Sequence, residues 1–342
     1  MLNSCSMVKS LLMIFVVMGH SCLFFGGHWL SLISPVFVNK PLGFFAEWLS
    51  SFHIYAFTLI SGYIFYYLKY ESLNVKYHNF FLFIFNKVKR LLFPYVFVSI
   101  LWVIPLSIIT GVFSEKTNLI NKFLLGGSPS QLWFLLMLFW VFIFAFILSN
   151  LWKKNNLWGI ITVIVFYAVG AIGTTMIGTW FQFFTGCIYL LLFFLGFKIR
   201  QYINLQSFLF RIPVVAYFFV DVSLFVFLLF LGQHDFYMKK CILFCGNSIL
   251  HIWGGVGAFI VLCKFVNKFH LVGNFAQRMQ KNTMSIYLLH QQIIYVILIV
   301  ANGCFGSFLH ALINFIISMI LSIALSELLL KWKFTRFIMG CG

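Results

Sequence analysis

The sequence predicts an all-α polytopic integral membrane protein with about ten transmembrane helices, the number of bilayer-length apolar stretches that it holds. Of its 342 residues, 63% are hydrophobic and only 8% are charged, whereas a soluble domain has about 25% charged residues. The aromatic fraction is 21%, and 47 Phe residues supply most of it. This composition excludes a soluble globular protein. It also excludes a disordered chain, which requires low hydrophobicity and many charges.

Apolar stretches of the length that crosses a bilayer as a helix recur along the whole chain. The predicted spans are residues 7–25, 44–68, 91–110, 131–151, 157–173, 179–197, 212–232, 241–262, 283–301 and 307–330. The first lacks a small-residue cleavage site, so we expect a retained anchor rather than a signal peptide. Because the loops between spans are short, we expect residues 1–342 to form one integral-membrane domain with no separate soluble domain.

The basic residues indicate how the predicted helices are oriented. If both termini are cytoplasmic, the inner segments hold 18 of the 23 Lys and Arg residues. These are Lys9, Lys69, Lys76, Lys87, Lys89, Arg90, Lys153, Lys154, Lys198, Arg200, Arg211, Lys264, Lys268, Arg278, Lys281, Lys331, Lys333 and Arg336. The outer segments hold Lys40, Lys116, Lys122, Lys239 and Lys240. Cytoplasmic loops are enriched in Lys and Arg, so we expect cytoplasmic termini and no nucleic-acid partner.

Two histidines lie inside the first two predicted spans, where ionisable side chains are costly and therefore candidates for function. His20 follows Lys9 with ten residues between them, a spacing that places both on one helix face about 16 Å apart. An imidazole at this depth is usable as a general base. A packing histidine and a snorkelling lysine would give the same pattern. His53 lies in the second span, ahead of Ser61-Gly62-Tyr63, whose small residues favour close helix packing.

A basic run, Lys87-Val88-Lys89-Arg90, leads into Leu91-Leu92-Phe93-Pro94-Tyr95 at the third span. Basic residues just inside a membrane usually contact anionic lipid and set topology. The same side chains are common phosphate ligands. The sequence leaves both interpretations open.

The other ionisable residues inside the spans have less clear roles. His290, in the ninth span, suits either a structural hydrogen bond or a site. Glu47 suits an interfacial carboxylate or a partner that orients a histidine, and Asp221 has no evident partner. Glu327 precedes Lys331 by four residues, the favourable helical order for an ion pair. The histidines are scattered one to a span, so we expect no metal.

In their order along the chain, these motifs resemble the acyltransferase-3 family of integral membrane acyltransferases. Lys9-x10-His20 is similar to the family's Arg/Lys-x10-His signature. The other motifs that resemble the family are Phe52-His53-Ile54 with Phe57 and Ser61-Gly62-Tyr63, the basic run with Leu91-Leu92-Phe93-Pro94-Tyr95, Leu132-Trp133-Phe134-Leu135, and Ser285-Ile286-Tyr287-Leu288-Leu289-His290.

The resemblance implies a membrane O-acyltransferase. Such an enzyme would move an acetyl or other acyl group from cytoplasmic acyl-CoA, with acetyl-CoA as cosubstrate, to a hydroxyl of a cell-surface polysaccharide or its lipid-linked precursor. This glycan and the lipid bilayer are the partners that the resemblance implies. The location that it implies is the plasma (bacterial inner) membrane. The catalytic residues would be His20 and His53, and those that bind the phosphates of CoA would be Lys9, Lys87, Lys89 and Arg90.

Two features of the sequence stand against a simple transfer of the family's properties. The family's commoner arginine is replaced by lysine at Lys9 and Lys87, which loses bidentate phosphate geometry. Buried polar residues would also suit a transporter or flippase for a lipid-linked glycan. The sequence does not identify the sugar, the acyl group or the oligomeric state.

Overall fold

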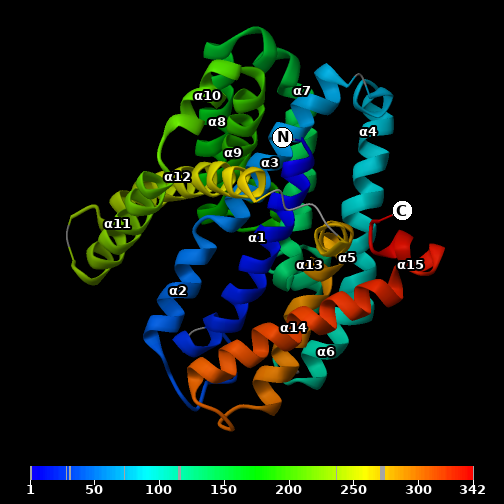
Figure 1. Cartoon of the computed structure of the whole chain (residues 1–342), viewed down its shortest axis with the longest axis vertical. Coiled ribbons are helices and arrows are strands. Elements are labelled where there is room, and N and C mark those ends of the chain that lie inside the picture. Colours follow the sequence, from blue (N-terminus) through cyan, green and yellow to red (C-terminus); the bar gives the residue numbers. More distant parts are fainter. Residues whose placement is uncertain are drawn as a thin grey trace.

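The computed structural model describes residues 2–27, 29–30, 32–72, 74–114, 117–235, 237–269 and 274–341, and every regular element in these ranges is helical (Figure 1). The α-helices are α1 (Leu2–Leu23), α2 (Lys40–Ser50), α3 (His53–Tyr66), α4 (Phe80–Lys87), α5 (Phe93–Val98), α6 (Ile104–Ile109), α7 (Trp133–Lys154), α8 (Asn156–Met176), α9 (Phe183–Gln201), α10 (Ile203–Arg211), α11 (Val214–Gln233), α12 (Lys239–Lys268), α13 (Asn274–Val300), α14 (Ser307–Leu329) and α15 (Lys333–Ile338).

Among the described residues, nine helical segments are long and apolar enough to cross a membrane. They are Ser4–Gly26, Phe80–Ile109, Ser130–Lys154, Asn156–Met176, Trp180–Gln201, Val214–Gln233, Lys239–Lys268, Gln277–Val300 and Ser307–Leu329. Each of them overlaps one of the predicted spans. The all-α polytopic membrane class is therefore confirmed.

The remaining predicted span, residues 44–68, is not one continuous helix. It is divided into α2 and α3 by a turn at Ser51 and Phe52. The Ser51 hydroxyl donates to the Trp48 carbonyl at 2.7 Å, and bonds of this kind compete with the regular hydrogen bonding of a helix. A prediction from hydrophobicity alone merges the two helices into one span, because the residues on both sides of the turn are apolar.

The third span starts earlier than residue 91 and contains two π-helical turns. It extends over Phe80–Ile109, and its π-turns are η4 (Val88–Leu92) and η5 (Ser99–Val103). The helices that follow carry Pro94 and Pro105 near their first residues. Proline has no N–H and clashes with the carbonyl four residues earlier, and a wider turn before it relieves that clash.

Helix α1 lies at the centre of the fold. It contacts α2, α3, α12, α13 and α14 (Figure 1), and its Val8, Leu12 and Val17 are fully buried. Most of the described side chains of the first span are therefore enclosed by protein rather than lipid. Ser4, Ser10 and Ser21 of this helix are buried as well.

Helices α3 and α9 approach closely because each presents a glycine to the other. A Cβ atom at Gly62 would overlap the Phe193 carbonyl, and one at Gly196 would overlap the Leu59 carbonyl. This contact agrees with the expectation that the small residue Gly62 allows close helix packing.

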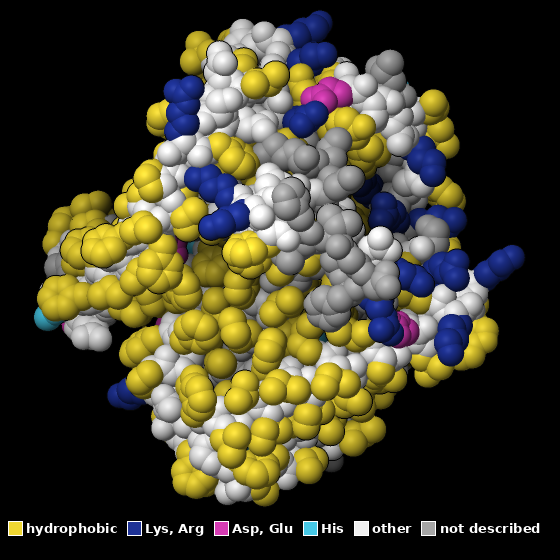
Figure 2. All heavy atoms as spheres, in the orientation of Figure 1, with side chains coloured by type: hydrophobic (Ala, Val, Ile, Leu, Met, Phe, Trp, Pro, Cys, Tyr) yellow, Lys and Arg dark blue, Asp and Glu magenta, His cyan; other side chains and the backbone are white. Residues whose placement is uncertain are grey.

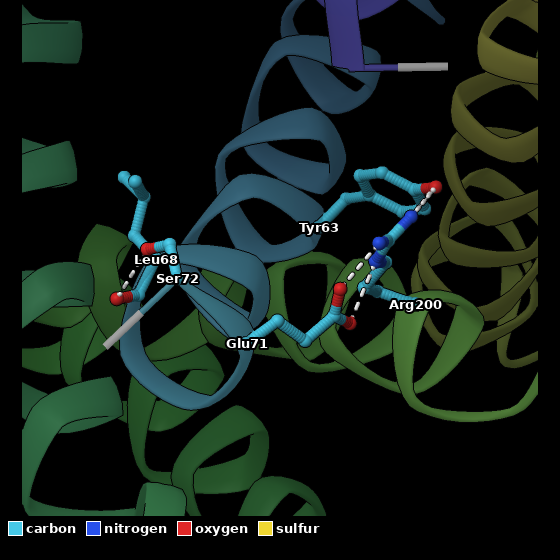
Figure 3. A network of polar contacts seen from close by, with 5 residues as sticks. All are labelled: Tyr63, Leu68, Glu71, Ser72 and Arg200. Carbon is cyan, nitrogen blue, oxygen red and sulfur yellow. Dashed lines mark hydrogen bonds and ion pairs between the residues drawn. The ribbon is translucent and has the colours of Figure 1, made fainter. Parts of the chain in front are cut away.

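An ion pair ties the ends of the same two segments together. Arg200, near the end of α9, donates from Nε to Glu71 Oε1 at 2.8 Å and from Nη1 to the Tyr63 hydroxyl at 2.9 Å (Figure 3). Glu71 ends the π-helical turn η2 (Tyr67–Glu71), which continues α3. The contact fixes the register of α3 against α9.

Many large hydrophobic side chains are exposed on the helices. Val165 on α8, Phe219 on α11 and Ile320 on α14 are each more than half exposed, as suits contact with lipid tails. Figure 2 shows a broad apolar surface over the lower part of this face, while Lys and Arg gather over its upper and right-hand parts. Charge is thus unevenly distributed over this face, as in proteins that obey the positive-inside rule.

Candidate active site

A cavity of about 1130 Å³ lies against α1 and extends to α3, α13 and the segment before α7. Helix α1 lines it with Ser6, Lys9, Met13, Val16 and His20, which recur every three or four residues and therefore share one helix face. An α-helix rises about 1.5 Å per residue, so the cavity follows α1 for about 16 Å between Lys9 and His20.

Helix α13 lines the same cavity and runs parallel to α1. The hydroxyls of Ser10 and Thr283 are 2.9 Å apart, and further along both helices His20 Nδ1 lies 3.0 Å from His290 Nε2. Lys281 is therefore near the Lys9 end of the cavity, and Tyr295 is near the His20 end.

Four cations from four elements define what we call the basic end of the cavity. They are Lys9 of α1, Arg90 of η4, Lys281 of α13 and Arg336 of α15. The segment after α15 packs here, because a Cβ atom at Gly340 would meet the Arg90 carbonyl at 2.7 Å.

None of these four cations has a carboxylate within 4.0 Å in the described part of the chain. The ion pairs found there are Arg200–Glu71, Lys239–Asp235 and Arg278–Glu327. The third corrects the pairing expected from spacing: Glu327 accepts two bonds from Arg278, both 2.7 Å long, rather than pairing with Lys331. A cluster of unpaired Arg and Lys side chains is typical of a site that binds phosphate groups.

Lys87 and Lys89, expected to act together with Arg90, are not among the residues that line the cavity. Lys87 is buried, with its Nζ 3.4 Å from the centroid of the Phe142 ring and 3.3 Å from the Tyr77 hydroxyl. Lys89 Nζ lies 5.2 Å from the Phe337 ring. Both cations are held over aromatic rings, and of the basic run only Arg90 reaches the cavity.

His20 lies in an aromatic environment at the other end, which we call the histidine end. Its ring is nearly parallel to that of His290, at 7° and with centroids 5.1 Å apart, and it also stacks on Trp29 at 5.6 Å. Trp29 in turn contacts Tyr295, with ring centroids 5.1 Å apart. These contacts fix the orientation of the His20 ring.

His53, the first residue of α3, also lines the cavity. Its Nδ1 lies 2.6 Å from the Leu49 carbonyl, close to the turn that separates α2 from α3. A carbonyl only accepts hydrogen bonds, so in a neutral ring this Nδ1 carries the proton and Nε2 does not. The break in the second span therefore holds the imidazole in place.

The segment before α7 contributes further polar side chains to the cavity wall. Gln131 donates from Nε2 to the Leu288 carbonyl at 3.1 Å and to Gln292 Oε1 at 2.8 Å, while its own buried Oε1 has no partner among the described residues. Ser130 and Gln182, both on the cavity, have positive φ angles of 55° and 56°. Non-glycine residues rarely adopt this conformation, and they do so most often at functional sites.

Lys122 is a further cation on the cavity wall. It lies in η6 (Ile120–Leu124), between membrane-spanning segments, with its Nζ 4.6 Å from the Phe113 ring. Partial burial lowers the pKa of Lys122 below its ordinary value. No Asp or Glu lines the cavity among the residues that the structure describes, so the whole cavity favours anionic or neutral ligands over cations.

Several cavity residues were beyond sequence reasoning. Lys281 and Arg336 were interpreted from the sequence only as basic residues that set the orientation of the helices. No three His, Cys, Asp or Glu side chains in the described ranges lie close enough to hold a metal ion.

The fold defines a polytopic membrane protein. Its cavity connects a cluster of cations of the kind that binds phosphate to histidines within the membrane-spanning part. In a comparison with protein-family models, residues 4–329 match the acyltransferase domain of the acyltransferase-3 family. The chain belongs to this family and is a membrane acyltransferase. Searches of curated proteins and of solved structures find no significant match. Family membership favours acyl transfer over the transporter or flippase alternative.

Proposed function

We propose that this acyltransferase moves an acetyl group, or another short acyl group, from cytoplasmic acyl-CoA to a hydroxyl of a cell-surface polysaccharide or its lipid-linked precursor. The observation that carries the proposal is that one cavity joins the unpaired cations of the basic end to His20 and His53. A donor with a charged head and a thin arm needs a site of this shape.

The donor occupies the basic end. CoA carries a diphosphate and a 3′-phosphate, and Lys9, Arg90, Lys281 and Arg336 offer positive charge to them. The arm of acyl-CoA then follows the cavity face of α1 over the roughly 16 Å to His20. On this assignment the basic end is cytoplasmic, in agreement with the predicted topology.

The acceptor hydroxyl reaches the thioester at the histidine end. His20 takes the hydroxyl proton as the acceptor oxygen attacks the acyl carbon. The new C–O bond forms, the C–S bond breaks, and the proton passes to the departing CoA thiolate. A positioned general base contributes about 10²–10⁴-fold to such a reaction. His53 is the second polar group beside the reacting atoms.

The walls at this end suit a carbohydrate. Trp29 and Tyr295 offer aromatic faces, and Gln131 offers an amide oxygen that has no partner among the residues that the structure describes. Binding sites for small polar molecules combine apolar and aromatic walls with a few well-placed polar groups. An acceptor hydroxyl that donates to Gln131 Oε1 would satisfy the buried oxygen.

Mass spectrometry of surface glycan from cells with and without this protein tests the proposal. We expect the same amount of glycan in both, with a mass difference of one acetyl group per modified sugar. A mass difference that corresponds to another acyl group would change the identity of the transferred group and leave the proposed reaction in place. Loss of the glycan itself would instead indicate transport.

A further inference from the structure

Two histidines from different spans meet at the histidine end, and sequence spacing did not connect them. His20 on α1 and His290 on α13 are separated by 270 positions, yet His20 Nδ1 lies 3.0 Å from His290 Nε2. His290 is fully buried and does not line the cavity. Its ring contacts those of His20 and Tyr287, which do line the cavity.

The backbone around His290 determines which of its nitrogens carries the proton. His290 Nδ1 lies 3.0 Å from the Ile286 carbonyl and 2.8 Å from the Tyr287 carbonyl. Carbonyl oxygens only accept, so Nδ1 is the protonated nitrogen. No ion pair in the described chain includes a histidine, and charging a buried imidazole without a partner is costly. His290 is therefore neutral, and its Nε2 is an acceptor.

The tautomer of His20 follows from that of His290. Since His290 Nε2 can only accept, His20 Nδ1 must donate to it, and His20 Nε2 is left with a free lone pair. This chain of hydrogen bonds, assigned from the partners of each nitrogen, begins at the helix backbone and ends at the reacting atom. In serine hydrolases a carboxylate holds the catalytic histidine in the same way.

We propose that His290 is a positioning residue that fixes His20 in the tautomer with Nε2 free to act as the base, and that stabilises the His20 imidazolium formed during acyl transfer. The proposal rests on the proposed function. When His20 Nε2 takes the acceptor proton, the His20 ring becomes a cation, and its Nδ1–H bond to His290 becomes a stronger, charge-assisted bond. The proton then leaves with the CoA thiolate, and the pair returns to its starting state.

Two substitutions at His290 separate positioning from packing. Gln places an amide oxygen close to the position of Nε2, so His290→Gln keeps an acceptor for His20 Nδ1. Asn is one methylene shorter and places its amide near the position of Nδ1, so His290→Asn keeps the bonds to the helix backbone and loses the acceptor. Both side chains are neutral and polar, so insertion into the membrane should be alike.

The assay measures release of CoA thiol from acetyl-CoA in membrane vesicles, with polysaccharide purified from the source cells as acceptor. We expect His290→Asn to lower kcat about 10–100-fold, the usual cost of losing a residue that orients a functional histidine. We expect His290→Gln to stay within about fivefold of the unmodified protein. The KM for acetyl-CoA should change less than about twofold in both, because donor binding lies elsewhere. His310→Gln, at a buried histidine outside the cavity, is the matched control and should keep kcat.

Equal loss in the Gln and Asn variants, or full activity in His290→Asn, would overturn the positioning role. A raised KM for acetyl-CoA with an unchanged kcat in His290→Asn would overturn it as well. Failure of the proposed function gives a different result: the unmodified protein would release no thiol that depends on acceptor.

Discussion

The four cations of the basic end differ in what each gives to a bound phosphate. Arg90 and Arg336 carry planar guanidinium groups that hold phosphate through two parallel N–H bonds, while Lys9 and Lys281 act as point charges. Arg336 is already oriented, because its Nη2 donates to the Leu330 carbonyl at 3.0 Å. Its Nε donates to the same carbonyl at 3.3 Å, so Nη1 and the second N–H of Nη2 are left to bind the phosphates of acyl-CoA.

The first prediction concerns Arg336. Arg336→Ala should raise the KM for acetyl-CoA about three- to tenfold, since a hydrogen bond to a charged group contributes about 1.5–3 kcal/mol and an exposed one contributes less. The kcat should not change. Raising the salt concentration should reproduce part of the effect in the unmodified protein, because exposed charges are screened.

Lys333 gives a matched control on the same short helix. It is exposed and does not line the cavity, so Lys333→Ala should leave the KM unchanged. An equal rise in both variants would mean that net charge alone, rather than a defined phosphate contact, accounts for Arg336.

At the scale of residues, the sequence predicts which side chains lie near each other when both are on the same helix. Helical periodicity was enough to place Lys9 and His20 on one face. It could not place Lys281 and Arg336 beside Arg90, nor His290 beside His20, because those contacts depend on how separate helices pack. Asp221 is a similar case: it accepts from Trp48 Nε1 at 2.8 Å across the α2–α11 contact, which spacing does not reveal.

At the scale of elements, the contact between α3 and α9 holds His53 in position. Gly62 leaves no space for a side chain against α9, and His53 begins the same helix. Gly62→Val should therefore destabilise the protein by about 1–3 kcal/mol, the usual cost of overpacking a close contact. Thermal unfolding in detergent would measure this as a lower Tm.

Gly232, near the end of α11, is the control for Gly62. A Cβ atom there meets nothing within 4 Å, so Gly232→Val should leave the Tm nearly unchanged. An unchanged Tm in Gly62→Val would contradict the prediction, because it would show that α3 and α9 can move apart without loss of stability.

The positions of the spans could be predicted from hydrophobicity, but their interruptions could not. The turn at Ser51 and Phe52 lies in an apolar stretch, and it depends on a serine hydroxyl that bonds the backbone. The π-turns η4 and η5 precede Pro94 and Pro105, and the prolines indicate a distortion without fixing its type. These interruptions place His53 and Arg90 on the cavity.

At the scale of the whole molecule, the proposed reaction requires the basic end to face the cytoplasm. Reporter fusions after residues 75, 155 and 205 should read cytoplasmic, and fusions near 120 and 235 should read external, because 18 of the 23 Lys and Arg residues then lie inside. A fusion after residue 272, which lies outside the described residues, should also read cytoplasmic. Two or more reversed readings would contradict this topology.

The central claim is that His20 removes the proton of the acceptor hydroxyl, in a cavity that acyl-CoA enters from the basic end. Gln keeps much of the size and hydrogen-bonding capacity of His but cannot take up a proton under these conditions. Cells that carry His20→Gln should therefore express and insert the protein normally and make surface glycan in the usual amount, without acetylation. Measuring both glycan amount and acetyl content in these cells is the most direct test. Full acetylation by His20→Gln would contradict the account.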